Sequence, residues 1–186
     1  MKAAQPQLVP TGPTTLSDVQ TLRKRARQHI ESGAVTTGYA ADRAAVLDLL
    51  NDALATELVC VLRYRRHYFM AKGIHSEAVK TEFLAHAGEE LAHADLLAKR
   101  ICELGGEPNF SPDGLSERSH AEYVEGTNIE SMIAENLVAE RIAIDSYREM
   151  IAYLGAHDPT TRRLLEEILA SEEEHADDLV SLLPQR

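Results

Sequence analysis

Hydrophobic residues recur every three or four positions in four long stretches of the chain, which is the spacing of one face of an α-helix. The predicted helices span about residues 42–72, 76–104, 127–154 and 158–182. Leu, Ala and Glu dominate the composition and aromatic residues make up only 5%, which favours helix over sheet. The pattern therefore predicts an all-α fold.

Glycine, proline and capping residues mark the ends of these helices. Gly73, Gly105 and Gly155 follow the first three hydrophobic patterns. The expected N-terminal caps are Ser76 for the second helix, Thr127 or Asn128 with Glu130 in a capping box for the third, and Asp158 before Pro159 for the fourth.

The connection between the second and third helices, residues 105–127, is too long for a tight helical hairpin. It contains Pro and Gly and has no sustained period, apart from an expected helical turn around His120 and Tyr123. Its length suits a connection that runs along a helix bundle. We therefore predict a four-helix bundle with one long crossover, formed by residues 41–186.

Residues 1–40 are predicted to be an N-terminal extension. Its first 15 residues are rich in Pro and are expected to be flexible, and a short amphipathic helix follows, with Ser17 and Gln20 as its capping box and Gly33 at its end. The residues on its apolar face are Leu16, Val19, Leu22, Ala26 and Ile30. The opposite face carries Arg23, Lys24, Arg25 and Arg27. This basic face is either the solvated side of a helix that docks on the bundle, or an arm that contacts DNA or a neighbouring subunit.

Near the middle of each long helix, a glutamate occupies a position where the hydrophobic pattern requires a core residue. These glutamates are Glu57, Glu90, Glu140 and Glu172, and two of them are followed three residues later by a histidine, in the pairs Glu90–His93 and Glu172–His175. Glu57 precedes Glu90 by 33 residues and Glu140 precedes Glu172 by 32, so the two halves of the chain repeat the same arrangement. All six side chains are predicted to meet in one layer near mid-height of the bundle.

Four buried carboxylates repel one another unless they are protonated or neutralised by cations. Four carboxylates and two neutral imidazoles balance the charge of two divalent cations, and this ligand set suits iron or manganese. The alternative is a salt-bridged polar layer without metal. No Lys or Arg occupies a core position at that level, so the sequence favours the dinuclear metal site.

The net charge of −11 makes DNA an unlikely partner of the bundle. Cys60 and Cys102 form no C-x-x-C pattern, which excludes a disulfide framework and a rubredoxin-type iron centre. No apolar run reaches transmembrane length, and the N-terminus lacks a signal-peptide pattern. The expected location is the cytoplasm, without a membrane partner.

Over residues 42–182 the chain resembles the bacterioferritin and ferritin-like superfamily. The motifs that carry the resemblance are Thr-Glu57-Leu-Val, Glu90-Leu-Ala-His93-Ala-Asp, Glu140 and Glu172-Glu-Glu-His175. The resemblance implies two iron ions per subunit, bridged by Glu90 and Glu172. Glu57 with His93 would complete one iron site, and Glu140 with His175 the other. Tyr64 matches a tyrosine near the centre of that family and is the implied catalytic residue.

Two departures from the bacterioferritin pattern affect cofactor and assembly. Leu91 stands where bacterioferritins have their haem-binding Met, so no haem is expected. Only 11 residues follow His175, which leaves no room for a fifth helix. A dodecamer is therefore favoured over a 24-subunit cage, as in Dps-like proteins with bacterioferritin-type sites.

Three further residues near the predicted site have open roles. Cys60 and Cys102 are expected to be small buried hydrophobic residues, because they are not placed as a pair beside the metals. His86 is either a hydrogen-bonded core histidine or a ligand for a transient third iron.

The leading hypothesis is a ferroxidase that oxidises Fe(II) to Fe(III) with O2 or H2O2 for iron storage and protection from oxidative stress. A manganese or iron peroxidase or catalase is one alternative, and a Dps-like DNA-protecting cage is another. The sequence leaves open the physiological metal, the oxidant and the subunit count.

Overall fold

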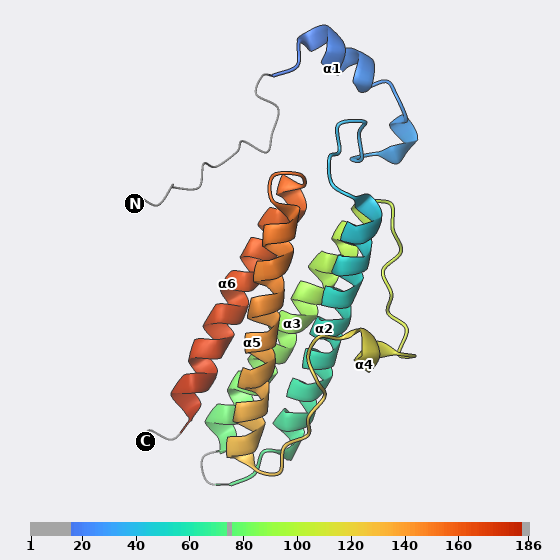
Figure 1. The fold of residues 1–186 in the computed structure, drawn as a ribbon. Helices are drawn as coiled ribbons and strands as arrows, with labels where there is room; N and C mark the ends of the chain where they lie inside the picture. The colour runs from blue at the N-terminus through green and yellow to red at the C-terminus, as the bar shows by residue number, and fades with distance from the viewer. Residues whose placement is uncertain (1–15, 74–75, 184–186) are drawn as a thin grey trace, which may run out of the picture.

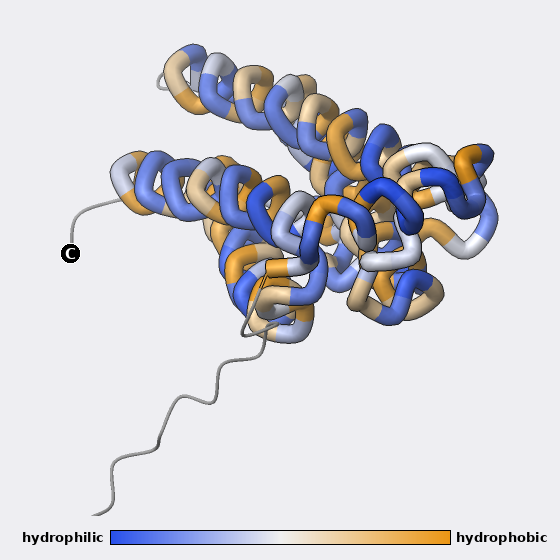
Figure 2. The backbone as a smooth tube through the Cα atoms, turned by 90° about the horizontal axis from the view of Figure 1, so that it is seen from above, coloured by the Kyte–Doolittle hydropathy of each residue, from blue (hydrophilic) through white to orange (hydrophobic). Residues whose placement is uncertain are grey.

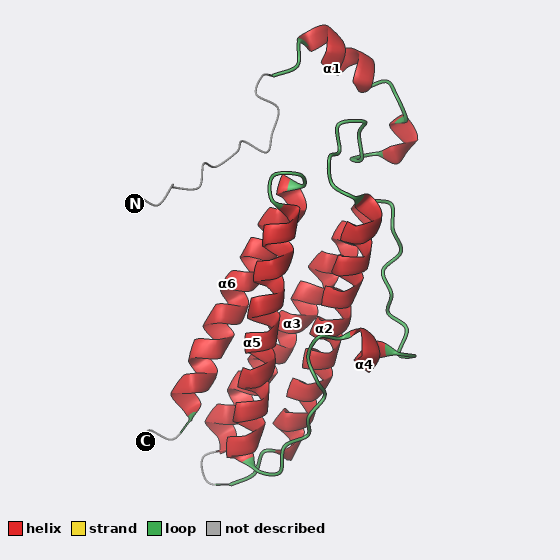
Figure 3. Ribbon diagram, in the orientation of Figure 1, coloured by secondary structure: helices red, strands yellow, loops and turns green. Residues whose placement is uncertain are grey.

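The structure, a computed structural model, describes residues 16–73 and 76–183. Four long helices lie side by side: α2 (Arg43–Met70), α3 (Ser76–Glu103), α5 (Ile129–Leu154) and α6 (Pro159–Leu182) (Figure 1). The short elements are α1 (Val19–Arg25), a 3-10 turn (Ile30–Ser32) and α4 (Leu115–Arg118). Within these ranges all regular structure is helical (Figure 3), and no helix is long and apolar enough to cross a membrane. The predicted all-α bundle is confirmed, whereas the Pro-rich residues 1–15 lie outside the described residues.

The helices pair as α2 with α3 and α5 with α6, and the crossover between α3 and α5 runs along α2. Side chains of α2 fasten it: Thr56 Oγ1 accepts a hydrogen bond from His120 N (3.0 Å), and Arg66 Nη1 donates to Glu125 O (2.7 Å). The helical turn expected around His120 and Tyr123 lies earlier in the crossover, as α4. The backbone N–H of His120 is hydrogen-bonded to Thr56 of α2 and is not available for a helical turn there.

The predicted caps of the second bundle half are largely correct. Asp158 caps α6 by accepting a hydrogen bond from Thr161 N (2.9 Å). Asn128 caps α5, but the reciprocal partner is Ser131, whose Oγ accepts from Asn128 N (3.0 Å). Glu130 would complete the capping box only if Thr127 were the cap, so choosing Asn128 moves the box by one residue.

The predicted caps of α1 and α3 are wrong. Ser76 is the first residue of α3 rather than its cap, and its hydroxyl donates to Gly73 O (2.8 Å). Asp18 caps α1 in place of Ser17, because its carboxylate accepts hydrogen bonds from the N–H groups of Gln20 and Thr21. A carboxylate also interacts more favourably than a hydroxyl with the positive end of the helix dipole.

The N-terminal helix does not dock on the bundle through its apolar face. α1 has no buried residue and ends at Arg25, well before Gly33. Leu16, Val19 and Leu22 are at least half exposed. Figure 1 shows α1 beyond the end of the bundle, because the segment that joins it to α2 leads away from the helices.

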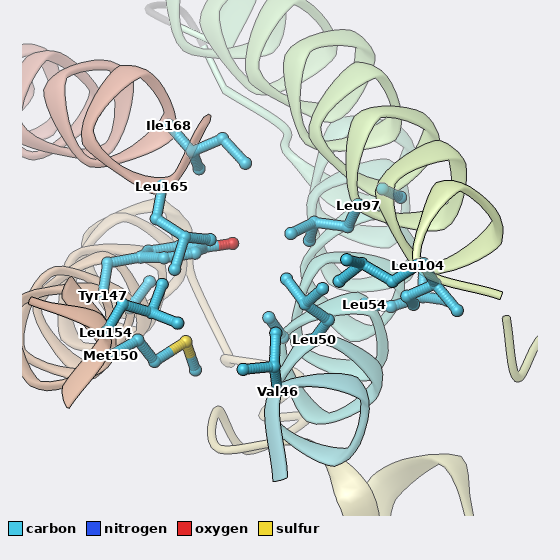
Figure 4. Close-up of a cluster of buried hydrophobic side chains, with 14 residues drawn as sticks. Val46, Leu50, Leu54, Leu97, Leu104, Tyr147, Met150, Leu154, Leu165 and Ile168 are labelled. Carbon is cyan, nitrogen blue, oxygen red and sulfur yellow. The ribbon is translucent and has the colours of Figure 1, made fainter. Parts of the chain in front are cut away.

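Hydrophobic and hydrophilic positions alternate along each long helix (Figure 2), and the hydrophobic ones form two separate buried clusters. The first contains Leu50, Leu54, Leu97, Tyr147 and Leu165, which face one another from all four helices (Figure 4). The second contains Cys60, Tyr64, Phe83, Ile133 and Leu179. The predicted polar positions lie between these two clusters along every long helix.

Candidate metal centre

The structure brings the six predicted ligand residues together inside the bundle. Glu57 comes from α2, Glu90 and His93 from α3, Glu140 from α5, and Glu172 and His175 from α6. None of them is more than 7% exposed. Each sits on the inward face of its helix because its neighbours three and four residues away are the apolar residues of the two clusters.

The ligand atoms form two groups that share two residues. One group is Glu57, Glu90, His93 and Glu172, and the other is Glu90, Glu140, Glu172 and His175; within each, the ligand atoms lie within 4.8 Å of one another. His93 Nδ1 is 3.0 Å from Glu172 Oε1 and 3.6 Å from Glu57 Oε2. His175 Nδ1 is 3.5 Å from Glu90 Oε1 and 4.0 Å from Glu140 Oε2. Both groups therefore combine atoms from the two halves of the chain.

Seven of these buried atoms have no hydrogen-bond partner in the part of the chain that the structure describes. They are both carboxylate oxygens of Glu90 and of Glu172, Oε2 of Glu140, and Nδ1 of His93 and of His175. A buried polar atom without a partner costs about 1–3 kcal/mol. Oxygen and imidazole donors that converge in this way fit a pair of hard or borderline divalent cations.

The carboxyl groups divide into two pairs by their pKa values. Burial and the charge of Glu90 raise the pKa of Glu57 to about 8, and burial together with Glu90 and Glu172 raises that of Glu140 well above its usual value. Burial also opposes ionisation of Glu90 and Glu172, but the carboxyl and imidazole groups close to them hold the pKa of each below its usual value. The outer pair, Glu57 and Glu140, thus favours the protonated form. The shared pair, Glu90 and Glu172, favours the ionised form.

The nearby carboxyl groups raise the pKa values of both imidazoles. Burial alone would lower the pKa of His93, but Glu172, Glu57 and Glu90 raise it to about 12. Glu172 and Glu90 likewise raise the pKa of His175 to about 11 against the effect of burial. Two imidazolium ions then balance the two ionised carboxylates, so protons neutralise the layer wherever cations do not.

Comparison with known proteins identifies the family of this chain. The family described as "Ferritin-like domain" matches residues 47–185. This chain belongs to the ferritin-like family.

Among its relatives, a bacterioferritin from Streptomyces coelicolor is 33% identical over 141 residues, which cover 74% of this chain and 79% of the relative. A "DNA protection during starvation protein" from Pyrococcus furiosus is 34% identical over 133 residues, 70% of this chain and 72% of the relative. Among solved structures, a dodecameric thioferritin, the bacterioferritin-related protein of Bacteroides fragilis, is 35% identical. It matches with a TM-score of 0.74 over 76% of this chain and 86% of the other.

Two tyrosines of this ferritin-like chain hydrogen-bond to the outer carboxyl groups. The hydroxyl of Tyr64 donates to Glu140 Oε1, and that of Tyr147 donates to Glu57 Oε1. Burial and the nearby carboxylates raise the pKa of both phenols. Sequence reasoning singled out Tyr64 only, although both tyrosines follow a core glutamate by seven residues and the repeat therefore indicated Tyr147 as well.

A second residue that sequence reasoning missed is Glu89. Its Oε2 lies 2.5 Å from His175 Nε2, the ring nitrogen that faces away from the other ligands. A carboxylate in this position fixes the orientation and tautomer of a ligand imidazole. Glu89 is an exposed residue of a Glu-rich helix and has no distinguishing sequence signal.

The remaining residues of interest have varied environments. Cys60 is buried as expected, but Cys102 is exposed because it lies on the outer face of α3. Leu91, at the position of the bacterioferritin haem ligand, is 48% exposed. His86 is buried, with Nδ1 3.2 Å from the hydroxyl of Tyr64.

Arg63 is buried near the site without neutralising it. Its guanidinium donates from Nε to Asn136 Oδ1 (2.9 Å) and from Nη1 to Glu122 O (3.0 Å). Neither partner is one of the four core glutamates. The arginine therefore secures the crossover against α2 and α5, and the charge of the carboxylates still calls for cations or protons.

Proposed function

We propose that this ferritin-like chain is a ferroxidase that oxidises Fe(II) at a dinuclear site, in iron storage and protection from oxidants. The observation that carries the proposal is the set of seven buried, unpartnered ligand atoms, distributed over two groups that share Glu90 and Glu172. The 33% identity to a bacterioferritin supports iron as the substrate.

In this proposal Glu90 and Glu172 bridge two ferrous ions. Glu57 and His93 complete one iron site, and Glu140 and His175 complete the other. Carboxylates suit both oxidation states of iron, because they are hard ligands and can change between one and two bound oxygens. Manganese satisfies the same donor set.

The redox step transfers two electrons, one from each Fe(II), which becomes Fe(III). Dioxygen accepts the two electrons and two protons to give H2O2, or H2O2 accepts them to give two molecules of water. The ferric ions then leave the site for a mineral store, so iron is a substrate rather than a resident cofactor.

We further propose that the chain assembles as a dodecamer, in line with the dodecameric thioferritin to which it is 35% identical. Size-exclusion chromatography with light scattering should give twelve times the mass of one chain, and a 24-subunit mass would contradict this assembly. The free thiols of Cys60 and Cys102 suit a reducing compartment such as the cytoplasm.

The test of the ferroxidase is the rate at which ferric absorbance develops after Fe(II) is added with O2 or with H2O2. Glu90→Ala and Glu172→Ala should reduce that rate to the rate in buffer, because each removes a ligand shared by both metal positions. Glu174→Ala is the matched control, since Glu174 is an exposed glutamate on α6 and should leave the rate unchanged.

Oxidation by Glu90→Ala as fast as by wild type would refute the assignment. The peroxidase or catalase alternative gives a different result in the same samples. Oxygen evolution from H2O2 by the manganese-loaded protein, without protein-dependent oxidation of Fe(II), would identify a catalase.

A further inference from the structure

A second polar cluster lies beside the dinuclear site, between α3 and α6. It consists of Glu82 and His86, one helical turn apart on α3, and Asp178 on α6. His86 Nε2 is 3.5 Å from Glu82 Oε1 and 3.7 Å from Asp178 Oδ2. The three side chains can direct one nitrogen and two oxygens to a common point, since these atoms lie within 4.8 Å of one another.

The imidazole of His86 is held in a fixed position that leaves one nitrogen free. Its side chain is 2% exposed, its ring stacks on that of His175 at 4.1 Å, and its Nδ1 faces the hydroxyl of Tyr64. Nε2 is buried and has no hydrogen-bond partner among the described residues. A buried nitrogen aimed between two carboxylates but too far from either for a hydrogen bond is an unsatisfied group that calls for a ligand.

The spacing of the three atoms fits a metal ion. Ligand atoms that each lie about 2.1 Å from one cation are roughly 3–3.6 Å from one another. The distances from His86 Nε2 to the two carboxylates are at the upper end of that range or just beyond it. A small shift of the partly exposed side chains of Glu82 and Asp178, which are 34% and 47% exposed, would complete the contacts.

We propose that Glu82, His86 and Asp178 form a third divalent-cation site, distinct from the dinuclear centre. One imidazole and two carboxylates suit Fe(II), Mn(II) or Co(II), with water in the open positions. The two partly exposed carboxylates give this site the contact with solvent that the fully buried dinuclear site lacks. Because His86 stacks on His175, the site lies directly next to the dinuclear centre.

The existence of this site depends only on its own geometry, whereas a role in supplying ions to the dinuclear centre would rest on the proposed function. The test therefore counts bound ions rather than turnover. Equilibrium dialysis against Co(II), followed by elemental analysis, should give three ions per chain for wild type and two for Glu82→Gln/Asp178→Asn. The matched control is Asp95→Asn/Asp177→Asn, which removes the same charge from exposed positions of α3 and α6 and should keep three ions.

A second variant separates this proposal from the ferroxidase. Glu57→Ala/Glu140→Ala removes the outer carboxylates of the dinuclear centre and should still bind an ion at His86. Crystals of that variant soaked in Co(II) should show an anomalous peak about 2.1 Å from His86 Nε2. Absence of the peak, or an equal ion count in wild type and in Glu82→Gln/Asp178→Asn, would overturn the third site, and neither result would affect the ferroxidase assignment.

Discussion

At the scale of single residues, Tyr64 and Tyr147 occupy equivalent positions but have different surroundings. Each comes from one apolar cluster and hydrogen-bonds to an outer carboxyl group. Among residues 16–73 and 76–183, a second partner of the hydroxyl is found for Tyr64 alone, the imidazole of His86. Oxidation of a phenol requires that its proton leave. Because Tyr64 donates that proton to Glu140, His86 Nδ1–H donates to the phenol oxygen and eases loss of the proton, which makes Tyr64 the better electron donor of the two.

We therefore expect Tyr64→Phe and Tyr147→Phe to weaken Fe(II) binding alike but to differ in oxidation. Loss of a hydrogen bond to a ligand carboxylate should reduce metal affinity about tenfold in each variant. Only Tyr64→Phe should slow oxidation at saturating Fe(II) and abolish the tyrosyl radical signal in electron paramagnetic resonance. Equal oxidation rates in the two variants would show that the phenols only position the carboxyl groups.

The shared, buried position of the six candidate ligand residues was predictable because a charged residue on an apolar helical face is visible in the sequence itself. Residues off that face carry no such signal. From the sequence, Glu89 cannot be distinguished from the other surface glutamates, because its contact depends on the orientation of His175. Cys102 was predicted to be buried, because the sequence did not show that it lies on the exposed face of its helix. Which side chain contacts the far ring nitrogen of a histidine in the site depends on distances between helices, which the sequence does not contain.

At the scale of elements, the start of α6 is tied to α3 and to the segment before α2. Arg100 donates from Nη2 to Asp158 Oδ1 (3.2 Å) and from Nε to Thr161 Oγ1 (2.8 Å), and the hydroxyl of Tyr39 donates to Asp158 Oδ2 (2.8 Å). Asp158 and Arg100 are 2% and 8% exposed. Although burial opposes its ionisation, the hydrogen bonds from Thr161 and Tyr39 and the charge of Arg100 hold the pKa of Asp158 below its usual value.

Removing the charge of Asp158 should destabilise the protein. Asp158→Asn keeps an N-cap oxygen but leaves Arg100 with the partly exposed Glu103, 3.1 Å from Nη1, as its remaining charged partner, which we expect to cost about 2 kcal/mol. Asp158→Ala also removes the cap and should cost about 1 kcal/mol more. Urea denaturation at pH 7 measures both, with Asp145→Asn as an exposed control that should change the free energy of unfolding by less than about 1 kcal/mol.

The ion pair of Asp158 and Arg100 also predicts that the free energy of unfolding depends on pH. Because the folded-state pKa of Asp158 is lowered, its contribution is fully present above the unfolded value of about 3.9 and is lost as pH falls through the folded value. The difference between wild type and Asp158→Asn should be constant from about pH 7 to about pH 5 and shrink below about pH 4. A difference that persisted unchanged at low pH would mean that the charge of Asp158 is not what stabilises this junction.

Element boundaries were less predictable than element identity. All four long helices were identified from their period, but the capping box of α5 moved by one residue and the crossover helix lies at residues 115–118. Several neighbouring residues can cap a helix equally well in isolation. The choice depends on tertiary contacts such as the bond from His120 N to Thr56, which no local pattern reveals.

At the scale of the whole molecule, the net charge of −11 opposes DNA binding even though α1 exposes basic residues in its last turn. We expect the full chain not to retard duplex DNA at about 150 mM salt, where each phosphate contact contributes little. Deletion of residues 1–30 should leave that result unchanged. Retardation by the full chain that disappears on deletion would instead support a DNA-protecting role through α1.

The two helix pairs, α2 with α3 and α5 with α6, meet at the polar layer. Glu172 of the second pair belongs to the ligand group of Glu57 and His93, and Glu90 of the first pair belongs to the group of Glu140 and His175. A cation bound in either group therefore contacts both pairs. Metal loading should act as a crosslink at mid-height of the bundle, between two apolar clusters that the polar layer separates.

This geometry predicts that metal stabilises the fold. An ion at about 100 times its dissociation constant adds about 2.7 kcal/mol per site, provided that the unfolded chain does not bind it. The thermal midpoint of the chelator-treated protein should rise clearly on addition of Mn(II), and the rise should be largely lost in Glu90→Ala, which removes a ligand from both groups. Glu174→Ala should behave like wild type. An equal rise in Glu90→Ala would place the stabilising ions elsewhere, because no cation could then join the helix pairs through the shared carboxylates.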